Sequence, residues 1–180
     1  MKSFRYLLLC GVLLQSGSSW AEKMQEPKAE YSADSVFETS GMQMKSKLYA
    51  APGKQRQEMG EGGMTMIIRR DKGLIWQLMG GNMYMESALP KNDPKDPMNM
   101  DVQRTTMGSE TVNGQKTTKY KVIATTPDGK KFGGFQWMTA EGIMVKADLL
   151  LKEAGKTERV HIELTNIQIA KQSPSLFEIP

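Results

Sequence analysis

Short runs in which apolar and polar residues alternate occupy most of the chain after residue 30. The clearest runs lie in the second half, where apolar side chains take every second position: Tyr120/Val122/Ala124, Phe135/Trp137, Ile143/Val145/Ala147/Leu149/Leu151 and Val160/Ile162/Leu164. Successive side chains of a strand point to opposite faces, so a period of two is typical of strands with one buried face. The pattern therefore predicts a mainly β protein.

Turn-forming tetrapeptides separate these runs. APGK, GEGG, RDKG and MGGN divide the first half of the chain, and VNGQ, PDGK, AEGI and EAGK divide the second. Gly, Pro, Asn and Asp are the residues that tight turns favour. The strands predicted between the turns are Tyr31–Ser40, Met42–Ala50, Lys54–Met59, Gly63–Arg70, Gly73–Met79, Asn82–Ala88, Arg104–Thr111, Lys116–Thr125, Lys131–Thr139, Gly142–Lys152 and Lys156–Ala170.

The segment 89–101, LPKNDPKDPMNMD, interrupts the strand pattern. It contains three prolines, and proline cannot donate a hydrogen bond within a central strand. We expect a loop that separates two halves of one domain. About eleven strands in meander order, without an amphipathic helix, predict a single large curved antiparallel sheet, an open or incomplete β-barrel with few or short helices. Its apolar side must either close on itself or be covered by a loop such as 89–101.

The first residues resemble an export signal. Lys2 and Arg5 precede an apolar run over residues 6–14, and small polar residues follow up to Ala21. This is the pattern of a secretory signal peptide, whose apolar part is too short for a permanent membrane span. We expect cleavage after Ala21 and a periplasmic product.

Removal of a signal peptide over residues 1–21 sets the expected domain organisation. Residues 22–30 are polar and read as a flexible lead-in, and residues 31–180 have an ordinary length for one β domain. The only cysteine, Cys10, leaves with the signal, so the mature chain is expected to have no disulfide. We expect a monomer.

Charge and residue types exclude several function classes. The net charge of the whole chain is +4, and its basic residues are interspersed with acidic ones, so nucleic-acid binding is not expected. A single histidine, no Gly-x-Ser-x-Gly motif and no thiol in the mature chain leave the usual nucleophile sets incomplete. The glycine-rich segments lack the Lys-Ser/Thr of a phosphate loop. We therefore expect no enzyme, no cofactor and no catalytic residue.

Methionine supplies the most distinctive pattern. The spacing Met-x-Met occurs in GMQMKSK, GMTMIIRR, GNMYMES and PMNMD. In a strand this spacing places both thioethers on one face, and hairpin pairing of neighbouring strands would bring such faces together. The candidate ligand-binding residues are Met42, Met44, Met64, Met66, Trp76, Met83, Met85 and Trp137.

Three interpretations of the methionines remain open. They could fill an ordinary core, because methionine packs like leucine. They could form an adaptable apolar wall for a lipid or an acyl chain, because the side chain is unbranched and polarizable. They could bind Cu(I) or Ag(I), because soft thioethers select those ions. The only histidine, His161, is expected on a solvent-facing side of its strand next to Glu163 and Thr165, so no histidine-containing metal site is predicted.

Three segments in order carry a family resemblance. They are APGKQRQEM followed by IIRRDKGLIW, then MGSETVNGQKTTKYKV, and finally the terminal SPSLFEIP. Together they resemble the LolA-like superfamily of periplasmic lipoprotein carriers, nearest to its small secreted bacterial members. The resemblance spans nearly all of residues 31–180.

The resemblance implies an incomplete antiparallel barrel whose concave apolar face holds acyl chains under helices or loops. It implies a lipid or lipoprotein acyl chain as the ligand, and transient contacts with a membrane or with envelope proteins. In the carriers an arginine that takes part in lid closure precedes the first proline, whereas this chain has Ala51 before Pro52. A relative that binds another hydrophobic ligand, or an envelope interaction module without a small ligand, fits this departure.

Overall fold

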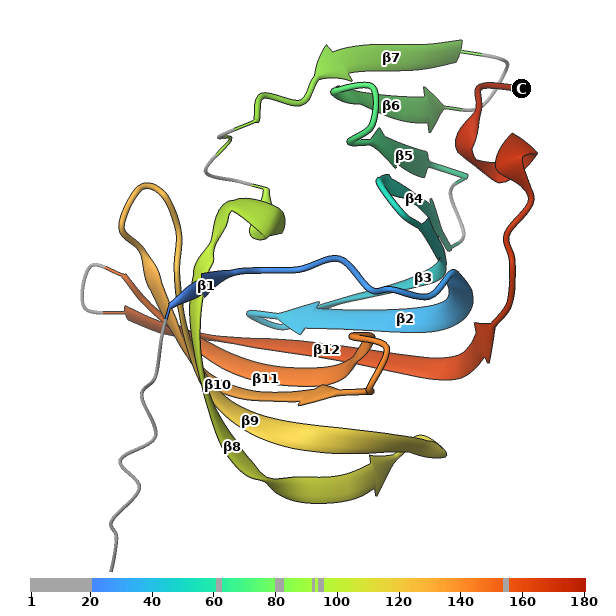
Figure 1. Ribbon diagram of the computed structural model, residues 1–180. Coiled ribbons are helices and arrows are strands. Elements are labelled where there is room, and N and C mark those ends of the chain that lie inside the picture. Colours follow the sequence, from blue (N-terminus) through green and yellow to red (C-terminus); the bar gives the residue numbers. More distant parts are fainter. Residues whose placement is uncertain (1–20, 61–62, 80–82, 92, 94–95, 154–155) are drawn as a thin grey trace, which may run out of the picture.

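The chain forms one large, open, antiparallel sheet (Figure 1). The computed structural model describes residues 21–60, 63–79, 83–91, 93, 96–153 and 156–180. Within these residues the helices are two short 3-10 turns, η1 (Pro97–Asn99) and η2 (Pro174–Phe177), and no helix has the length and apolar character that a membrane span requires. The predicted fold class is confirmed.

Twelve strands make up the sheet, one more than the number expected. They are β1 (Glu22–Lys23), β2 (Tyr31–Thr39), β3 (Met42–Ala51), β4 (Lys54–Met59), β5 (Thr65–Arg69), β6 (Leu74–Met79), β7 (Met83–Ala88), β8 (Asp101–Val112), β9 (Gln115–Thr125), β10 (Lys131–Met138), β11 (Met144–Glu153) and β12 (Lys156–Ile169). The additional strand is β1, which is too short to produce a recognisable alternation.

The strand order is β1-β8-β9-β10-β11-β12-β2-β3-β4-β5-β6-β7. The expected meander therefore holds within β2–β7 and within β8–β12, but not across the whole chain. The last strand pairs with β2, and β7 and β8 lie near opposite edges of the sheet. The proline-rich connection between β7 and β8 consequently bridges the two edges (Figure 1).

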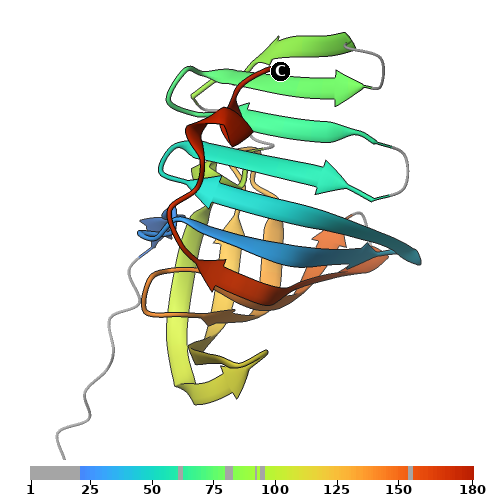
Figure 2. The ribbon, with the colours of Figure 1, turned by 90° about the vertical axis from the view of Figure 1, so that its right-hand side faces the viewer.

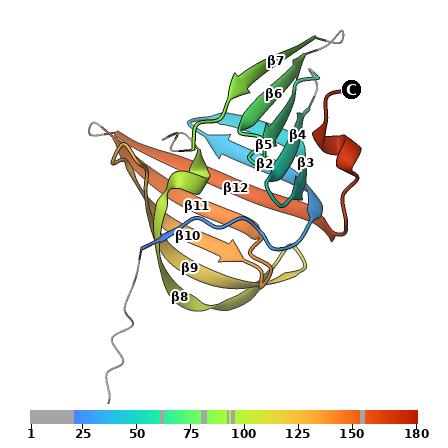
Figure 3. The same ribbon diagram turned by 45° about the horizontal axis from the view of Figure 1, so that its top comes forward.

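The sheet is bent into a trough with a concave and a convex face (Figures 1 and 3). The concave face carries two clusters of buried side chains. One joins β2, β3, β12 and the residue before β11, and consists of Tyr31, Ala33, Leu48, Ile143 and Leu164. The other joins β8 and β9 and consists of Val102, Val122 and Ala124. Figure 3 shows the segment between β1 and β2 crossing this face in front of β9–β12.

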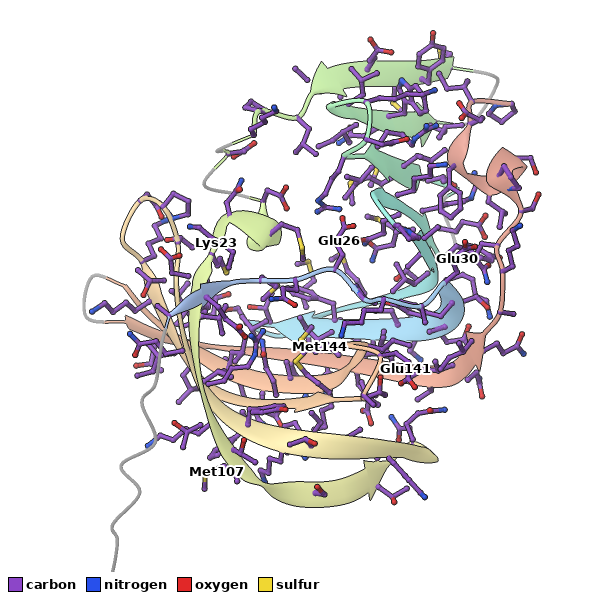
Figure 4. All side chains as sticks on the ribbon, viewed as in Figure 1. Lys23, Glu26, Glu30, Met107, Glu141 and Met144 are labelled. Atoms are coloured by element: carbon purple, nitrogen blue, oxygen red, sulfur yellow. The ribbon has the colours of Figure 1, made fainter. Side chains whose placement is uncertain are left out.

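Residues 22–30, read from the sequence as a flexible lead-in, make specific contacts along this path. Met24 N–H donates to the carbonyl of Met100 at 3.2 Å, and Lys28 N–H donates to the carbonyl of Glu141 at 2.8 Å. Figure 4 shows Lys23, Glu26 and Glu30 spread along the segment over the inside of the trough. The expected signal peptide, apart from Ala21, lies outside the described residues.

The C-terminal segment covers the convex face of β4–β6 (Figure 1). Phe177 is 1% exposed and packs on Ile67 and Trp76. Burial of a side chain of this size stabilises a fold by about 1.5–3 kcal/mol. The same part of the sheet thus has one face closed by the C-terminus and the other face turned to the trough.

Candidate functional site

Eight methionines lie on the concave face of strands β3–β7, and we call this surface the methionine face. Strand registers place them there, because paired residues of neighbouring strands share a face. Leu48, a member of the concave core, pairs with Gln57, which pairs with Met66. Following this register, the methionine face comprises Met42, Met44, Met59, Met64, Met66, Met79, Met83 and Met85.

Four of these residues form a line across neighbouring strands, which we call the tip row: Met59, Met64, Met79 and Met83. Met59 N–H donates to the carbonyl of Met64 at 3.0 Å. Met79 pairs with Met83. The pairing of Thr65 with Leu78 continues by one residue to bring Met64 beside Met79. One step further from the turns, Met66 and Met85 flank Gln77 in a second line.

The methionine face occupies one end of its strands. Strands β2, β4 and β6 end, and β3, β5 and β7 begin, at the same side of the sheet, at the right in Figure 2. Met42 is 53% exposed, Met83 62% and Met64 39%. These thioethers therefore line an open surface, neither a closed cavity nor a solid core.

An ion-paired cluster holds the opposite end of the same concave face. Arg70 Nη2 donates to Asp96 Oδ1 at 2.8 Å, and its Nε lies 3.8 Å from Glu26 Oε1. The other oxygen of Glu26 accepts the N–H of Gly53 at 2.8 Å. Asp96 is buried, so its pairing with Arg70 matters more than a surface ion pair would. The cluster ties the β1–β2 segment and the β7–β8 connection to the turns of β3–β6.

The two candidate tryptophans lie on the convex face. Trp76 is buried beneath the C-terminal segment, and its Nε1 donates to Glu86 at 2.7 Å. Trp137 is covered by the amines of Lys119 and Lys146, which lie 4.7 and 5.0 Å from the ring centre. The structure therefore brings together the six methionines predicted from Met-x-Met spacing and separates both tryptophans from them.

Sequence reasoning missed Met59 and Met79, which complete the tip row. Neither belongs to a Met-x-Met pair. Each is the last residue of its strand before a glycine-rich turn, and aligning the predicted hairpins at GEGG and MGGN would have identified both.

The convex face of β10–β12 is polar. His161 Nδ1 lies 2.7 Å from Asp148 Oδ1, and Arg159 donates to the same carboxylate at 3.2 Å. Burial alone would raise the pKa of Asp148, but the hydrogen bonds from His161 and Arg159 hold it below its usual value. Beside these residues a shallow hollow of about 430 Å³ opens at the β2–β3 turn. Its lining is mixed: the charged side chains of Glu38 and Arg159 lie there together with Met42. In the parts of the chain that the structure describes, no three His, Cys, Asp or Glu side chains come together as a metal site.

Arg69 fixes the C-terminal segment to the convex face. It is 4% exposed, and its Nε and Nη2 donate to the two oxygens of Asp71 at 2.8 and 2.7 Å. Its Nη1 donates to the carbonyl of Phe177 at 3.0 Å and to Glu178 at 2.5 Å. These hydrogen bonds hold the pKa of Asp71 and of Glu178 below their usual values. The arrangement closes the convex face of β4–β6 and leaves the concave face as the accessible apolar surface there.

Comparison with known proteins shows the fold but no closer kinship. No family model matches the chain, and no curated protein matches its sequence. The Pseudomonas aeruginosa MucB structure in complex with MucA aligns at a TM-score of 0.54 and 17% identity, over 84% of this chain and 56% of that one. A structure of MucB itself aligns at 0.52 and 16%, over 84% and 57%.

A third solved structure is more distant. It is a putative outer membrane lipoprotein-sorting protein domain from Vibrio parahaemolyticus, with a TM-score of 0.41 and 10% identity, over 86% of this chain and 91% of that one. The MucB chains are longer: this chain spans little more than half the length of each of those it matches. What it shares with MucB is the fold.

Proposed function

We propose that this chain is a periplasmic, non-enzymatic binding protein whose methionine face holds the acyl chain of a lipid or a lipoprotein. The observation that carries the proposal is the gathering of eight methionines on one concave, accessible surface. Unbranched, polarizable side chains adapt to a flexible hydrocarbon. A contiguous exposed apolar patch on a soluble domain is typical of an interaction site.

The energy available on this surface fits reversible binding. Met42, Met79, Met83 and Met85 are each about half exposed, at 53, 46, 62 and 47%. Full burial of a methionine contributes about 1.5–3 kcal/mol, so covering each remaining half contributes about 1 kcal/mol. The ligand adds ~0.8 kcal/mol for each methylene removed from water. The sum exceeds an ordering cost of several kcal/mol once about ten methylenes are covered.

The fold shared with MucB supports an exported binding role, because MucB has been crystallised as a complex with another protein, MucA. The ion-paired cluster at Arg70 supports a surface with one closed end. A linear chain lying along β3–β7 would meet buried charge at that end and thioethers at the hairpin tips. We therefore propose that the acyl chain enters from the hairpin tips.

The test is lipid retention by protein purified from the periplasm, measured by native mass spectrometry and by extraction of bound lipid. Met64→Asp combined with Met83→Asp places two charges on the methionine face at exposed positions, so the fold should persist while lipid is lost. Met107→Asp is the matched control, because Met107 is 54% exposed on β8, away from the methionine face (Figure 4). Absence of lipid from the wild type, or equal retention by the double variant and the control, would refute the proposal.

The free edge at β7 favours a second candidate, binding of an extended segment of an envelope protein. All six residues of β7 are exposed, and Glu86 is its only charged residue. At the opposite side of the sheet, β1 pairs with Asp101 and Val102 of β8. The rest of β8 carries an irregularity between Thr106 and Gly108, a device that discourages strand addition. A photo-crosslinking amino acid in place of Tyr84 would trap such a partner in cells. Failure to trap any envelope protein would remove this candidate without touching the lipid proposal.

A further inference from the structure

We propose that the tip row is a binding site for a soft monovalent cation, Cu(I) or its analogue Ag(I), made of thioethers alone. The tip row is part of the methionine face, but copper binding can be tested separately from lipid binding, because it needs sulfur and not merely apolar surface. The observation behind it is that Met59, Met64, Met79 and Met83 come from four neighbouring strands in one line.

The geometry brings at least three sulfurs within reach of one ion. Neighbouring strands lie about 4.8 Å apart, and directly paired residues on one face have Cβ atoms about 4.5–5.5 Å apart. Met64 lies between Met59 and Met79, so the two outer Cβ atoms are roughly 10 Å apart. A methionine side chain has three rotatable bonds. The side chains of Met59 and Met79 can therefore lean toward each other until their sulfurs and that of Met64 converge.

High solvent exposure leaves three of these side chains free to move. Met64, Met79 and Met83 are 39, 46 and 62% exposed, so no packed neighbour has to be displaced when an ion binds. Met59 is half-buried and anchors one end of the line. An ion would reach the site from solvent without any opening of the fold.

The chemistry of the surroundings selects the ion. Thioethers are soft, neutral ligands that favour Cu(I), whereas Zn²⁺ and Ni²⁺ prefer imidazole, thiolate or carboxylate. The described residues contain no cluster of three such groups anywhere. The uncharged side chains of Gln57 and Gln77 lie next to the tip row on the same face. The cationic Arg70 is at the far end of the strands and is paired with Asp96, so it neither repels the ion nor competes for it.

The experiment is an anaerobic titration of the purified protein with Cu(I) in the presence of ascorbate and a chromophoric Cu(I) chelator. The wild type should withdraw one equivalent of Cu(I) from the chelator. Met64→Leu combined with Met79→Leu should weaken binding at least tenfold, because it leaves only the two outermost thioethers. Leucine keeps the apolar volume, so folding should be unchanged, and far-UV circular dichroism checks this. Met107→Leu, an exposed methionine away from the row, should bind as the wild type does.

Two further readouts sharpen the result. Addition of Ag(I) should shift the methionine methyl NMR signals of the tip row and leave that of Met107 in place, and Zn²⁺ should shift none. The proposal is overturned if the wild type takes no Cu(I) from the chelator, or if the double leucine variant competes equally well. Loss of copper binding by a double leucine variant that remains folded supports this site, and intact copper binding without any lipid removes only the proposed carrier function.

Discussion

Two adjacent glycines in β10 should respond in opposite ways to the same substitution. A Cβ on Gly134 would lie 2.1 Å from the carbonyl oxygen of Asp148 and 2.9 Å from Cα of Leu149, both on the paired strand β11. Ordinary van der Waals contact with a Cβ begins at 3.4 Å. At Gly133 a Cβ would meet nothing within 4 Å. The structure thus predicts that Gly134→Ala is strongly destabilising and Gly133→Ala is not.

The size of the destabilisation by Gly134→Ala depends on which atoms must move to make room for the Cβ. The obstacle at Gly134 is backbone in the middle of the sheet, so no rotamer change can relieve the clash. Overpacking typically costs 1–3 kcal/mol, and a backbone obstacle places Gly134→Ala at about 3 kcal/mol or more. At Gly133 the loss of unfolded-state freedom stabilises by about 0.4–1 kcal/mol if the backbone angles suit alanine. For a chain of this size the first change lowers Tm by roughly 6–12 °C.

Urea unfolding followed by tryptophan fluorescence measures both changes, and far-UV circular dichroism checks that each variant starts folded. Trp137 lies in β10 itself and reports directly on this part of the sheet. If the free energies of unfolding of Gly134→Ala and Gly133→Ala differ by less than about 1 kcal/mol, the close approach of β10 and β11 deduced from the structure is wrong.

Two further predictions concern the C-terminal segment. Phe177→Ala should reduce the free energy of unfolding by about 3–5 kcal/mol, whereas Phe135→Ala, at a ring that is 37% exposed, should cost clearly less; equal losses in urea titrations would show that the segment contributes no core. Asp71 and Glu178 have lowered pKa values in the folded state because they accept hydrogen bonds from Arg69, so their stabilisation is complete above about pH 5 and is lost as the pH falls through those values. The urea midpoint should therefore drop between pH 6 and pH 3 by less in Arg69→Met than in the wild type, and identical drops would contradict the ion pairing.

Much of the local structure could be predicted from the sequence. The strand Lys54–Met59 was predicted with its observed bounds, and Tyr31–Ser40 with one residue too many. The first of these strands begins, and the second ends, at a turn where glycine adopts positive φ: Gly53 at +69° precedes Lys54, and Gly41 at +81° follows Thr39 and Ser40. Turn chemistry is local, so composition alone reveals it.

The face on which a side chain lies was harder to predict. In β6 both sides carry large apolar residues: Leu74, Trp76 and Leu78 lie on one side, and Ile75 and Met79 lie on the other, with the polar Gln77 between them. Alternation shows that Trp76 and Met79 point in opposite directions, but it does not say which of them meets the trough. That depends on η2, far along the chain, which covers the Trp76 side.

The sequence by itself determined the β character, most strand limits to within one or two residues, and the fact that each Met-x-Met pair in a strand shares one face. Backbone alternation and turn propensity, which decide these features, act over a few residues. Only the tertiary structure decided that β12 joins β2, that the C-terminal segment takes one face of β4–β6, and that Met59 and Met79 complete a line of thioethers with Met64 and Met83. These outcomes depend on pairing and packing between residues distant in sequence, and no local pattern encodes which distant partner is chosen.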